Sequence, residues 1–173
     1  MSEAMVALSV AVLTVSDTRT EETDRSGQTL VERLEAAGHR LHDKRIIADD
    51  VYHIRAQVAA WIADAEVQVI LTTGGTGFTG RDSTPEAVSV LLDKRIEGFG
   101  ELFRHLSWQE IGSSTVQSRC LGGLANATVV FCLPGSTGAC RTAWDGILAE
   151  QLDSRHQPCN FANLVIPERG QHV

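Results

Sequence analysis

Long apolar runs are missing from this chain of 173 residues. Apolar stretches such as residues 67–71 and 127–133 fall far short of the ~20 residues that a helix needs to cross a bilayer. The chain begins with Met-Ser-Glu-Ala, which places an acid where a secretory signal carries positive charge. We therefore expect a cytoplasmic protein with no membrane partner.

Cysteine motifs are also lacking. The four cysteines form no Cys-x-x-Cys pair and show no zinc-like spacing with the histidines. Two of them have apolar neighbours, where a free cysteine behaves as a small hydrophobic residue. We expect buried, reduced thiols, which suit the cytosol, and a catalytic cysteine is the less favoured alternative. The four are Cys120, Cys132, Cys140 and Cys159.

The chain has no excess of positive charge. Its 15 lysines and arginines stand against 22 aspartates and glutamates, which gives a formal net charge of −7. Nucleic-acid backbones require clustered lysine and arginine, so we expect no nucleic-acid partner. A phosphorylated small molecule stays compatible with this charge, because backbone N–H groups and a few cations can hold it.

The composition is typical of a globular protein, with 43% hydrophobic and 21% charged residues. No internal repeat, linker or low-complexity segment divides the chain, and its length suffices for one core. We expect a single domain over residues 1–173, with flexible ends at residues 1–6 and 162–173. Residues 112–123 are polar and contain glycine, and they are expected to be partly irregular.

Apolar runs alternate with helical periodicities along the chain. The runs predict four strands, of which the second is more polar and is expected at a sheet edge. Strands that alternate with helices predict βαβ units and a mainly parallel sheet. The predicted strands lie at residues 7–15, 41–47, 67–72 and 127–133.

Apolar residues at helical spacing predict a helix after each of these strands and a further helix at residues 98–111. Gly38 is placed to end the first helix. Thr84 as N-cap and Pro85 as first helical residue indicate the start of the third. We expect the helix at residues 98–111 to bury Leu102.

Three predicted strands end in polar or glycine-rich residues. In an open parallel sheet, ligands collect beyond the carboxyl ends of the strands, and those ends share one edge. We therefore expect a common pocket formed by Ser16 and Asp17; by Thr73, Gly74, Gly75, Thr76 and Gly77; and by Pro134, Gly135 and Ser136.

The glycine turn at residues 73–77 can hold a phosphate group. Glycine removes Cβ atoms and permits positive φ, so that successive N–H groups can point into one concavity. The hydroxyls of Thr73 and Thr76 can add donors. Because the turn matches neither the Walker pattern nor the dinucleotide fingerprint, a tight turn without a ligand is the alternative.

Asp82 follows the glycine turn and precedes the predicted helix start. An aspartate beside polyphosphate would be repelled unless Mg²⁺ intervened, held by one or two carboxylates, phosphate oxygens and water. Asp82 is therefore a candidate metal ligand, and a helix-capping acid is the alternative. Asp49 and Asp50 form an adjacent acidic pair after the predicted edge strand. The pair is a candidate for the metal site only if the fold brings it towards Asp82.

Other polar residues can reach the pocket from a distance. Glu101 and Ser107 share the helix predicted at residues 98–111, and they can contribute if that helix points inward. Four arginines can supply cationic contacts, although most arginines are simply exposed. These are Arg19, Arg25, Arg104 and Arg119.

The order of these motifs resembles that of the molybdopterin-binding family, which includes MoaB, MogA and the gephyrin G domain. The similarity runs from about residue 7 to residue 161. Residues 140–144 and 158–161 look specifically like the MoaB branch. The matching motifs lie at residues 16–19, 24–27, 72–77, 81–87, 99–104, 117–119 and 133–136.

The resemblance implies a three-layer α/β/α fold that assembles as a trimer or hexamer. It also implies binding of molybdopterin and ATP with Mg²⁺, and transfer of AMP onto the terminal phosphate of the pterin, with release of pyrophosphate. A non-catalytic molybdopterin-binding protein of the same pathway is the alternative.

Residue roles implied by the resemblance fall on matching positions. Asp82 corresponds to an aspartate required for adenylyl transfer. Asp49 corresponds to a second important aspartate, although Ala48 replaces the usual proline and leaves Asp50 as the other choice. Asp82 and Asp49 are thus the expected catalytic and metal-ligating residues, and Ser118 joins the expected ligand-binding residues.

Overall fold

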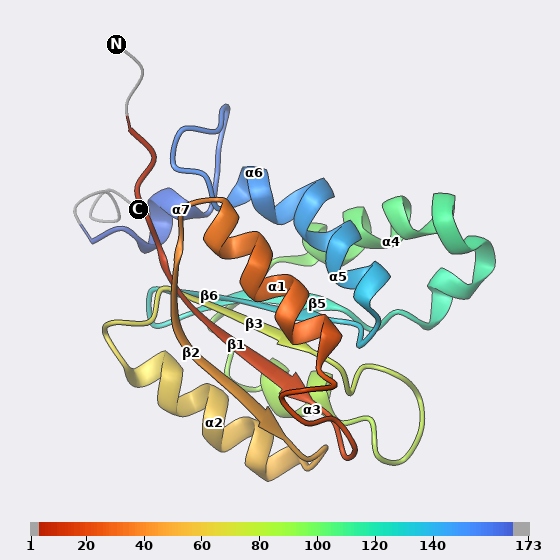
Figure 1. The fold of residues 1–173 in the computed structure, drawn as a ribbon. Helices are drawn as coiled ribbons and strands as arrows, with labels where there is room; N and C mark the ends of the chain where they lie inside the picture. Colours follow the sequence, from red (N-terminus) through yellow and green to blue (C-terminus); the bar gives the residue numbers. More distant parts are fainter. Residues whose placement is uncertain (1–3, 168–173) are drawn as a thin grey trace.

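Helices cover both faces of a six-stranded sheet in the computed structural model, which describes residues 4–167 (Figure 1). The strand order is β2-β1-β3-β6-β5-β4. The first four strands in this order run parallel, while β5 is antiparallel to both β6 and β4. The expected α/β/α fold with a mainly parallel sheet is confirmed. The strands are β1 (Ser9–Val15), β2 (Arg40–Ile47), β3 (Val69–Thr73), β4 (Lys94–Arg95), β5 (Leu121–Ala125) and β6 (Thr128–Leu133).

Two hydrophobic cores lie on opposite faces of the sheet. Helices α1, α4, α5 and α7 pack over one face, and α2 and α3 pack over the other (Figure 1). Within residues 4–167, no helix is long and apolar enough to span a membrane. The helices are α1 (Arg25–Ala36), α2 (Val51–Ala63), α3 (Thr84–Ser89), α4 (Glu97–Ile111), a 3-10 helix (Gly112–Gln117), α5 (Thr137–Ala143), a π-helix (Trp144–Leu148), α6 (Ala149–Gln151) and α7 (Ala162–Val165).

The central strand β1 is an almost continuous apolar run because both of its faces are buried. All seven of its residues are buried. Its side chains alternate between the two cores: Val10 and Val12 enter one, and Ala11 and Leu13 enter the other. The more polar β2 lies at the edge of the sheet, as expected.

Strand β5 begins within residues 112–123, the stretch that was expected to be partly irregular. Residues 112–117 form the 3-10 helix, and residues 121–125 pair with β6 on one side and with the short β4 on the other. Neither β4 nor β5 was predicted, because β4 has two residues and β5 contains two glycines in five. Asn126 and Ala127, both with positive φ, form the tight connection from β5 to β6.

Two predictions about helices were wrong in detail. Leu102 is 43% exposed and is not a core residue of α4. The N-cap of α3 is Ser83 and not Thr84. Thr84 is fully buried, and its hydroxyl donates a hydrogen bond to the carbonyl oxygen of Gly74 at 2.9 Å. The Thr84 side chain, which the local sequence pattern predicted to cap the helix, thus forms a tertiary hydrogen bond to Gly74 instead.

The tail contradicts the expected flexible end over residues 162–166. Residues 162–165 form α7, and Ala162 and Val165 are buried in the core. Just before this helix, the ring of Phe161 meets that of Phe131 edge-on, with centroids 6.0 Å apart. A four-residue helix is too short to show a sequence period, so the prediction missed it. In the other expected flexible end, residues 1–6, the N–H of Val6 donates to the Ser154 hydroxyl at 3.0 Å and the side chain of Val6 packs against the core. Residues 1–3 and 168–173 lie outside the described residues.

We expect Gly122→Ala to lower the free energy of unfolding by about 1–3 kcal/mol, because overpacking a filled core has this effect. A Cβ atom at Gly122 would lie 2.8 Å from Cδ1 of Phe131, whose ring already packs against Phe99 with centroids 4.7 Å apart. Urea unfolding monitored by tryptophan fluorescence measures the change. Gly98→Ala is the control, since a Cβ at that helical position meets nothing within 4 Å. Equal destabilisation of both variants would contradict the packing argument.

Candidate functional site

The carboxyl ends of β1, β3 and β6 meet on one edge of the sheet, as the sequence predicted (Figure 1). Together with the first residues of α1 and α5, they surround a cavity of about 250 Å³. The helix starts bring unpaired backbone N–H groups and the positive ends of two helix dipoles to this cavity. Of the predicted residues, those that line it are Ser16, Thr73, Gly74, Gly135 and Ser136.

Gly74 and Gly75 are required by the geometry of the turn. Both have positive φ, of 98° and 65°. A Cβ atom on Gly74 would lie 2.2 Å from the carbonyl oxygen of Val15, and one on Gly75 would lie 2.3 Å from Oγ1 of Thr84. A Cβ on Gly135 would lie 3.2 Å from Cα of Gly74. These glycines therefore let three chain segments approach one another closely.

The Thr73 hydroxyl is not available to a ligand, contrary to our expectation. It is buried and donates to the carbonyl oxygen of Pro134 at 2.9 Å, which ties the end of β3 to the end of β6. The N–H groups of Gly75 and Thr76 have no hydrogen-bond partner in the described part of the chain. Backbone N–H groups, rather than the Thr73 hydroxyl, are thus the donors that the turn offers to an anion.

Helix α1 begins at the cavity with an acid that is already paired. Asp24 is buried, accepts a hydrogen bond from the Thr14 hydroxyl at 2.7 Å, and lies 3.0 Å from Nζ of Lys44. Arg19 and Arg25 line the same cavity and form no ion pair with any of residues 4–167. Lys44 is shared between Asp24 and Glu21, at 3.0 and 2.7 Å, so Asp24 lies in an ion-pair network. The two arginines add positive charge to the cavity that no described ion pair neutralises. The sequence had placed them only among four candidate arginines.

Asp49 and Asp82 both lie beside the glycine turn, and Ser83, the residue after Asp82, connects them by hydrogen bonds to Asp49. Asp49 is buried, and its Oδ1 accepts hydrogen bonds from the N–H of Ser83 at 3.1 Å and from its hydroxyl at 2.6 Å. Its other oxygen faces Gly75, where a Cβ would lie 2.7 Å from Oδ2. The fold therefore brings Asp49 towards Asp82, the condition under which the sequence made it a candidate.

The carboxylate of Asp82 faces the chain that follows the glycine turn. Its Oδ2 accepts from the hydroxyl of Thr79 at 2.6 Å and from the N–H of Thr79 at 2.9 Å. These bonds, chiefly that of the hydroxyl, hold the pKa of Asp82 below its usual value. A side-chain cap of α3 is absent among the described hydrogen bonds, so the capping role considered for Asp82 is not observed.

Asp50 has a different position from its neighbour Asp49. It is the N-cap of α2 and accepts hydrogen bonds from the N–H groups of Tyr52 at 3.0 Å and His53 at 2.9 Å. The bonds from the backbone of His53 and Tyr52 lower the pKa of Asp50. Of the two adjacent acids, Asp49 is therefore the one that faces the glycine turn.

Asp17 follows Ser16 just after the end of β1 and is paired with Arg81. The guanidinium donates to both carboxylate oxygens, at 3.0 and 2.7 Å, and Oδ1 also accepts from the N–H of Asp49 at 3.0 Å. The hydrogen bond from Arg81 lowers the pKa of Asp17 and raises that of Arg81. This pair joins the segment after β1 to the segment after β3.

Arg119 holds the loop after the glycine turn in place. Its Nε and Nη2 donate to the carbonyl oxygen of Gly77 at 2.9 and 2.6 Å, and they also reach the carbonyl oxygens of Thr76 and Asp82, both at 3.2 Å. Its Nη1 forms an ion pair with Glu86. The sequence predicted a ligand-binding role for Arg119, but its donors are directed at its own chain.

Three further predicted residues are not brought to the cavity. Ser118 uses its carbonyl oxygen to accept a hydrogen bond from Arg104 at 3.2 Å. Glu101 is exposed on α4, and Ser107 is buried on the same helix. None of the three lines the cavity between β1, β3 and β6.

The cysteines supply no reactive thiol at the site. Burial raises the pKa of Cys120 to about 11, that of Cys132 to about 12 and that of Cys140 to about 11. The expected burial is confirmed for these three, whereas Cys159 is exposed. Within the described ranges, no group of three or more His, Cys, Asp or Glu could hold a metal ion by itself.

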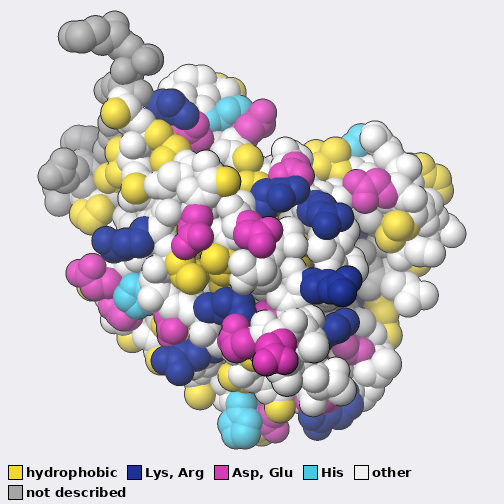
Figure 2. Space-filling view, in the orientation of Figure 1, with side chains coloured by type: hydrophobic (Ala, Val, Ile, Leu, Met, Phe, Trp, Pro, Cys, Tyr) yellow, Lys and Arg dark blue, Asp and Glu magenta, His cyan; other side chains and the backbone are white. Residues whose placement is uncertain are grey.

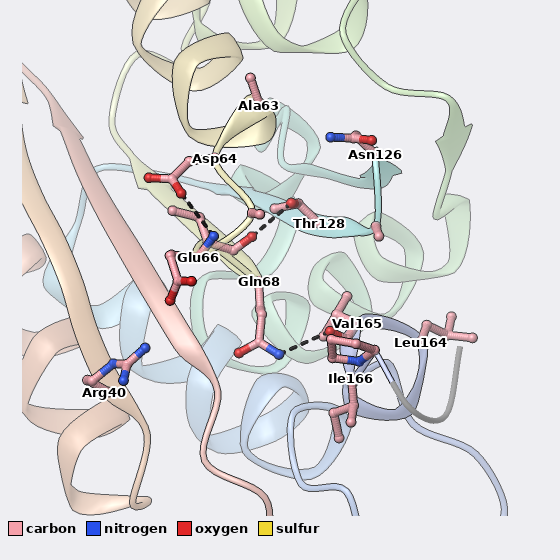
Figure 3. A pocket seen from close by; sticks show the side chains of 14 residues that line it. Arg40, Ala63, Asp64, Glu66, Gln68, Asn126, Thr128, Leu164, Val165 and Ile166 are labelled. Carbon is pink, nitrogen blue, oxygen red and sulfur yellow. Dashed lines mark hydrogen bonds between the residues drawn. The ribbon is translucent and has the colours of Figure 1, made fainter. Parts of the chain in front are cut away.

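A larger cavity, of about 610 Å³, lies at the opposite, amino-terminal edge of the sheet (Figure 3). Several of its polar groups are already paired: the side chain of Gln68 donates to the carbonyl oxygen of Val165 at 3.0 Å, and Asp64 accepts from the N–H of Glu66 at 2.9 Å. It lacks the glycine turn and the converging helix starts. We therefore place the candidate site at the carboxyl edge.

Charge is mixed on the face of the molecule shown in Figure 2. Lysine and arginine side chains lie among aspartate and glutamate side chains there, instead of forming one continuous basic patch. Binding of a nucleic-acid backbone requires clustered positive charge. This face therefore gives no support to nucleic-acid binding.

The fold and the site define an α/β protein with a mainly parallel sheet and a candidate anion site at the carboxyl edge of that sheet. Residues 11–154 match the family model described as "Probable molybdopterin binding domain". This match covers most of the chain. The chain therefore belongs to the molybdopterin-binding domain family.

Similar proteins lie in the MoaB branch of that family. Molybdenum cofactor biosynthesis protein B of Escherichia coli (strain K12) is 54% identical over 161 residues, which are 93% of this chain and 95% of the relative. A crystal structure of a molybdenum cofactor biosynthesis protein B has 50% identity and a TM-score of 0.84, over 87% of this chain and 94% of that one. The tungsten cofactor synthesizing protein MoaB from Pyrococcus furiosus has 35% identity and a TM-score of 0.75, over 83% and 92%.

We expect the carboxyl group of Asp82 to titrate below 3.8, its ordinary value, and Thr79→Ala to raise its midpoint. The folded state favours the ionised form, so this group stabilises the fold fully above its ordinary pKa and stops doing so as the pH falls through the folded pKa. Carboxyl ¹³C NMR across the acid range measures both midpoints. Thr79→Ser keeps the hydroxyl and serves as control; an unchanged midpoint in Thr79→Ala would contradict the assignment.

Proposed function

We propose that this chain acts in molybdenum cofactor biosynthesis, by binding molybdopterin at the carboxyl edge and adenylylating it with Mg-ATP. The supporting observation is the meeting of the glycine turn with the starts of α1 and α5 at one cavity, beside two acids, in a member of the molybdopterin-binding domain family. In this reaction a phosphate oxygen of the pterin bonds to the α-phosphorus of ATP, and pyrophosphate leaves.

The residues beside the glycine turn fit a magnesium ion that phosphate oxygens also bind. Asp49 Oδ2 has no hydrogen-bond partner among residues 4–167, and the low pKa of Asp82 keeps that carboxylate charged. Mg²⁺ prefers such oxygen ligands and fills its remaining positions with phosphate oxygens and water. Bound there, Mg²⁺ would screen the charge of the triphosphate and of the leaving pyrophosphate.

The remaining tasks fall to the chain itself. The N–H groups of Gly75 and Thr76 and the first N–H groups of α5 can hold phosphate oxygens, and Arg19 and Arg25 add positive charge. These groups align the attacking phosphate with the nucleotide. No protein nucleophile is needed, and the attacking phosphate is already ionised, which removes the need for a general base.

We expect Asp82→Asn and Asp49→Asn each to slow adenylyl transfer by roughly 100-fold or more, because each removes a carboxylate charge that would hold Mg²⁺ beside the reacting phosphates. The assay supplies molybdopterin, ATP and Mg²⁺ to the purified protein and measures pyrophosphate and the adenylylated pterin. Asp50→Asn is the matched control: it changes the adjacent acid, which caps α2, and should retain nearly the wild-type rate.

Saturable binding of molybdopterin without turnover by the wild-type protein would contradict the enzymatic proposal. That outcome would support the alternative of a non-catalytic molybdopterin-binding protein in the same pathway. Full loss of activity in Asp50→Asn, with activity retained in Asp49→Asn, would reverse the assignment of the two acids.

We also propose that the chain forms a homo-oligomer, in line with the trimer or hexamer that its resemblance implies. Large apolar side chains are exposed along α4 and the 3-10 helix that follows it. Trp108 is 58% exposed, Ile111 52% and Val116 76%. Apolar side chains that lie close together on a surface commonly mark a protein interface.

We expect light scattering of the wild-type protein to give a multiple of the chain mass of 18.7 kDa, and the double variant Trp108→Glu with Ile111→Glu to give a smaller mass. Charged side chains at a buried interface are strongly unfavourable. Tyr52→Glu, which changes an exposed aromatic residue on α2, serves as control. A wild-type mass of one chain at micromolar concentration would contradict oligomerisation.

A further inference from the structure

Phe78 is a large apolar side chain that the fold leaves in contact with water. It follows the glycine turn directly, and 68% of its surface is exposed. Its neighbour Thr79 holds the carboxylate of Asp82 with two hydrogen bonds. The ring is therefore attached, one residue away, to the group that positions a candidate metal ligand. Neither the sequence motifs nor the proposed reaction gave Phe78 a role.

The ring is backed on one side by a guanidinium whose position is fixed. Cζ of Arg119 lies 5.1 Å from the centroid of Phe78, within the range of a cation–π contact. The same guanidinium donates to the carbonyl oxygens of Thr76, Gly77 and Asp82 and pairs with Glu86. The donors of Arg119 are thus used by the loop and by Glu86. Its remaining contact is the one between the guanidinium and the ring of Phe78.

We propose that Phe78 is a specificity-determining residue, on which the planar heteroaromatic ring of the phosphorylated ligand stacks. The inference rests on the proposed function for the ligand class, a purine nucleotide or a pterin phosphate. Every such ring has a π-face, and aromatic side chains bind these faces in proteins that hold unstacked bases. In this arrangement Arg119 is a positioning residue, and it acts through Phe78 and the loop carbonyls.

Tyr52 is the rival platform near the same edge. It is 71% exposed, and Cζ of Arg55 lies 5.7 Å from its ring centroid. It belongs to the first turn of α2, beside the capping acid Asp50, whereas Phe78 belongs to the loop that carries Asp82. Arg55 is fixed on the carbonyl oxygens of α3, at 3.2 Å from that of Ala87. The structure therefore favours Phe78 and supplies Tyr52 as a matched comparison.

The test compares ligands with and without a ring. We expect Phe78→Ala to weaken ATP binding on the order of 10-fold or more, as removal of a stacking side chain does. Tripolyphosphate, which has the charge but no ring, should bind to Phe78→Ala and wild type equally. Calorimetry with Mg²⁺ present measures both. A pterin monophosphate is the second arm: loss of its binding, and not that of ATP, would assign the ring to the pterin.

Further variants separate stacking from the structure of the loop. Phe78→Trp should retain ATP binding, and Phe78→Leu, which is apolar without a π-face, should behave like Phe78→Ala. Equal weakening of ATP and tripolyphosphate, a change of oligomeric mass in Phe78→Ala, or a loss confined to Tyr52→Ala would each overturn the inference. Ring-dependent binding without adenylyl transfer would instead contradict the proposed reaction and leave the role of Phe78 standing.

Discussion

The site depends on how the turn at Gly74 and Gly75 is attached to the segments on either side. The N–H of Gly74 donates to the carbonyl oxygen of Leu133 at 3.1 Å, which fixes the turn to the end of β6. Thr84 binds it from α3: its hydroxyl donates to the carbonyl oxygen of Gly74 and its N–H to that of Gly75, at 2.9 and 3.0 Å. Asp82 and Ser83 lie directly before Thr84, and Ser83 donates two hydrogen bonds to Asp49. The attachment of Thr84 therefore places both Asp82 and Asp49 beside the turn.

The order of the four parallel strands and the helices that follow them was predictable, because β1, β3 and β6 are buried apolar runs and β2 is a recognisable, more polar edge run. The meeting of three strand ends followed from the parallel sheet alone. What was missed depended on contacts between distant residues. The sequence around Thr84 is typical of an N-cap, but its hydroxyl donates to the carbonyl oxygen of Gly74 instead. Strand β5 was missed because its glycine Gly122 is needed for a packing reason, since a Cβ there would clash with the ring of Phe131. The roles of Asp24 and Lys44 were missed for the same reason, since the two are 20 residues apart in the chain.

Charge at the carboxyl edge is divided into two regions. In the cavity, Asp24 shares Lys44 with Glu21, and Arg19 and Arg25 add positive charge that no described ion pair neutralises. Beside the glycine turn, Asp49 and Asp82 are held by hydroxyl and N–H donors and have no arginine or lysine in direct contact through their carboxylates among the described ion pairs. An anion and a cation can thus each find a complementary surface within one site, although the net charge of the chain is −7.

The buried thiols have a consequence for a ligand that carries sulfur. Molybdopterin, the proposed substrate, has a dithiolene, and a bond between its sulfur and a cysteine would require a cysteine thiolate together with an oxidant. Cys140 lies beside the site with its sulfur 3.3 Å from the Thr73 hydroxyl, yet its raised pKa keeps it protonated and its burial keeps it covered. Cys140 therefore presents no thiolate to a dithiolene bound in the cavity.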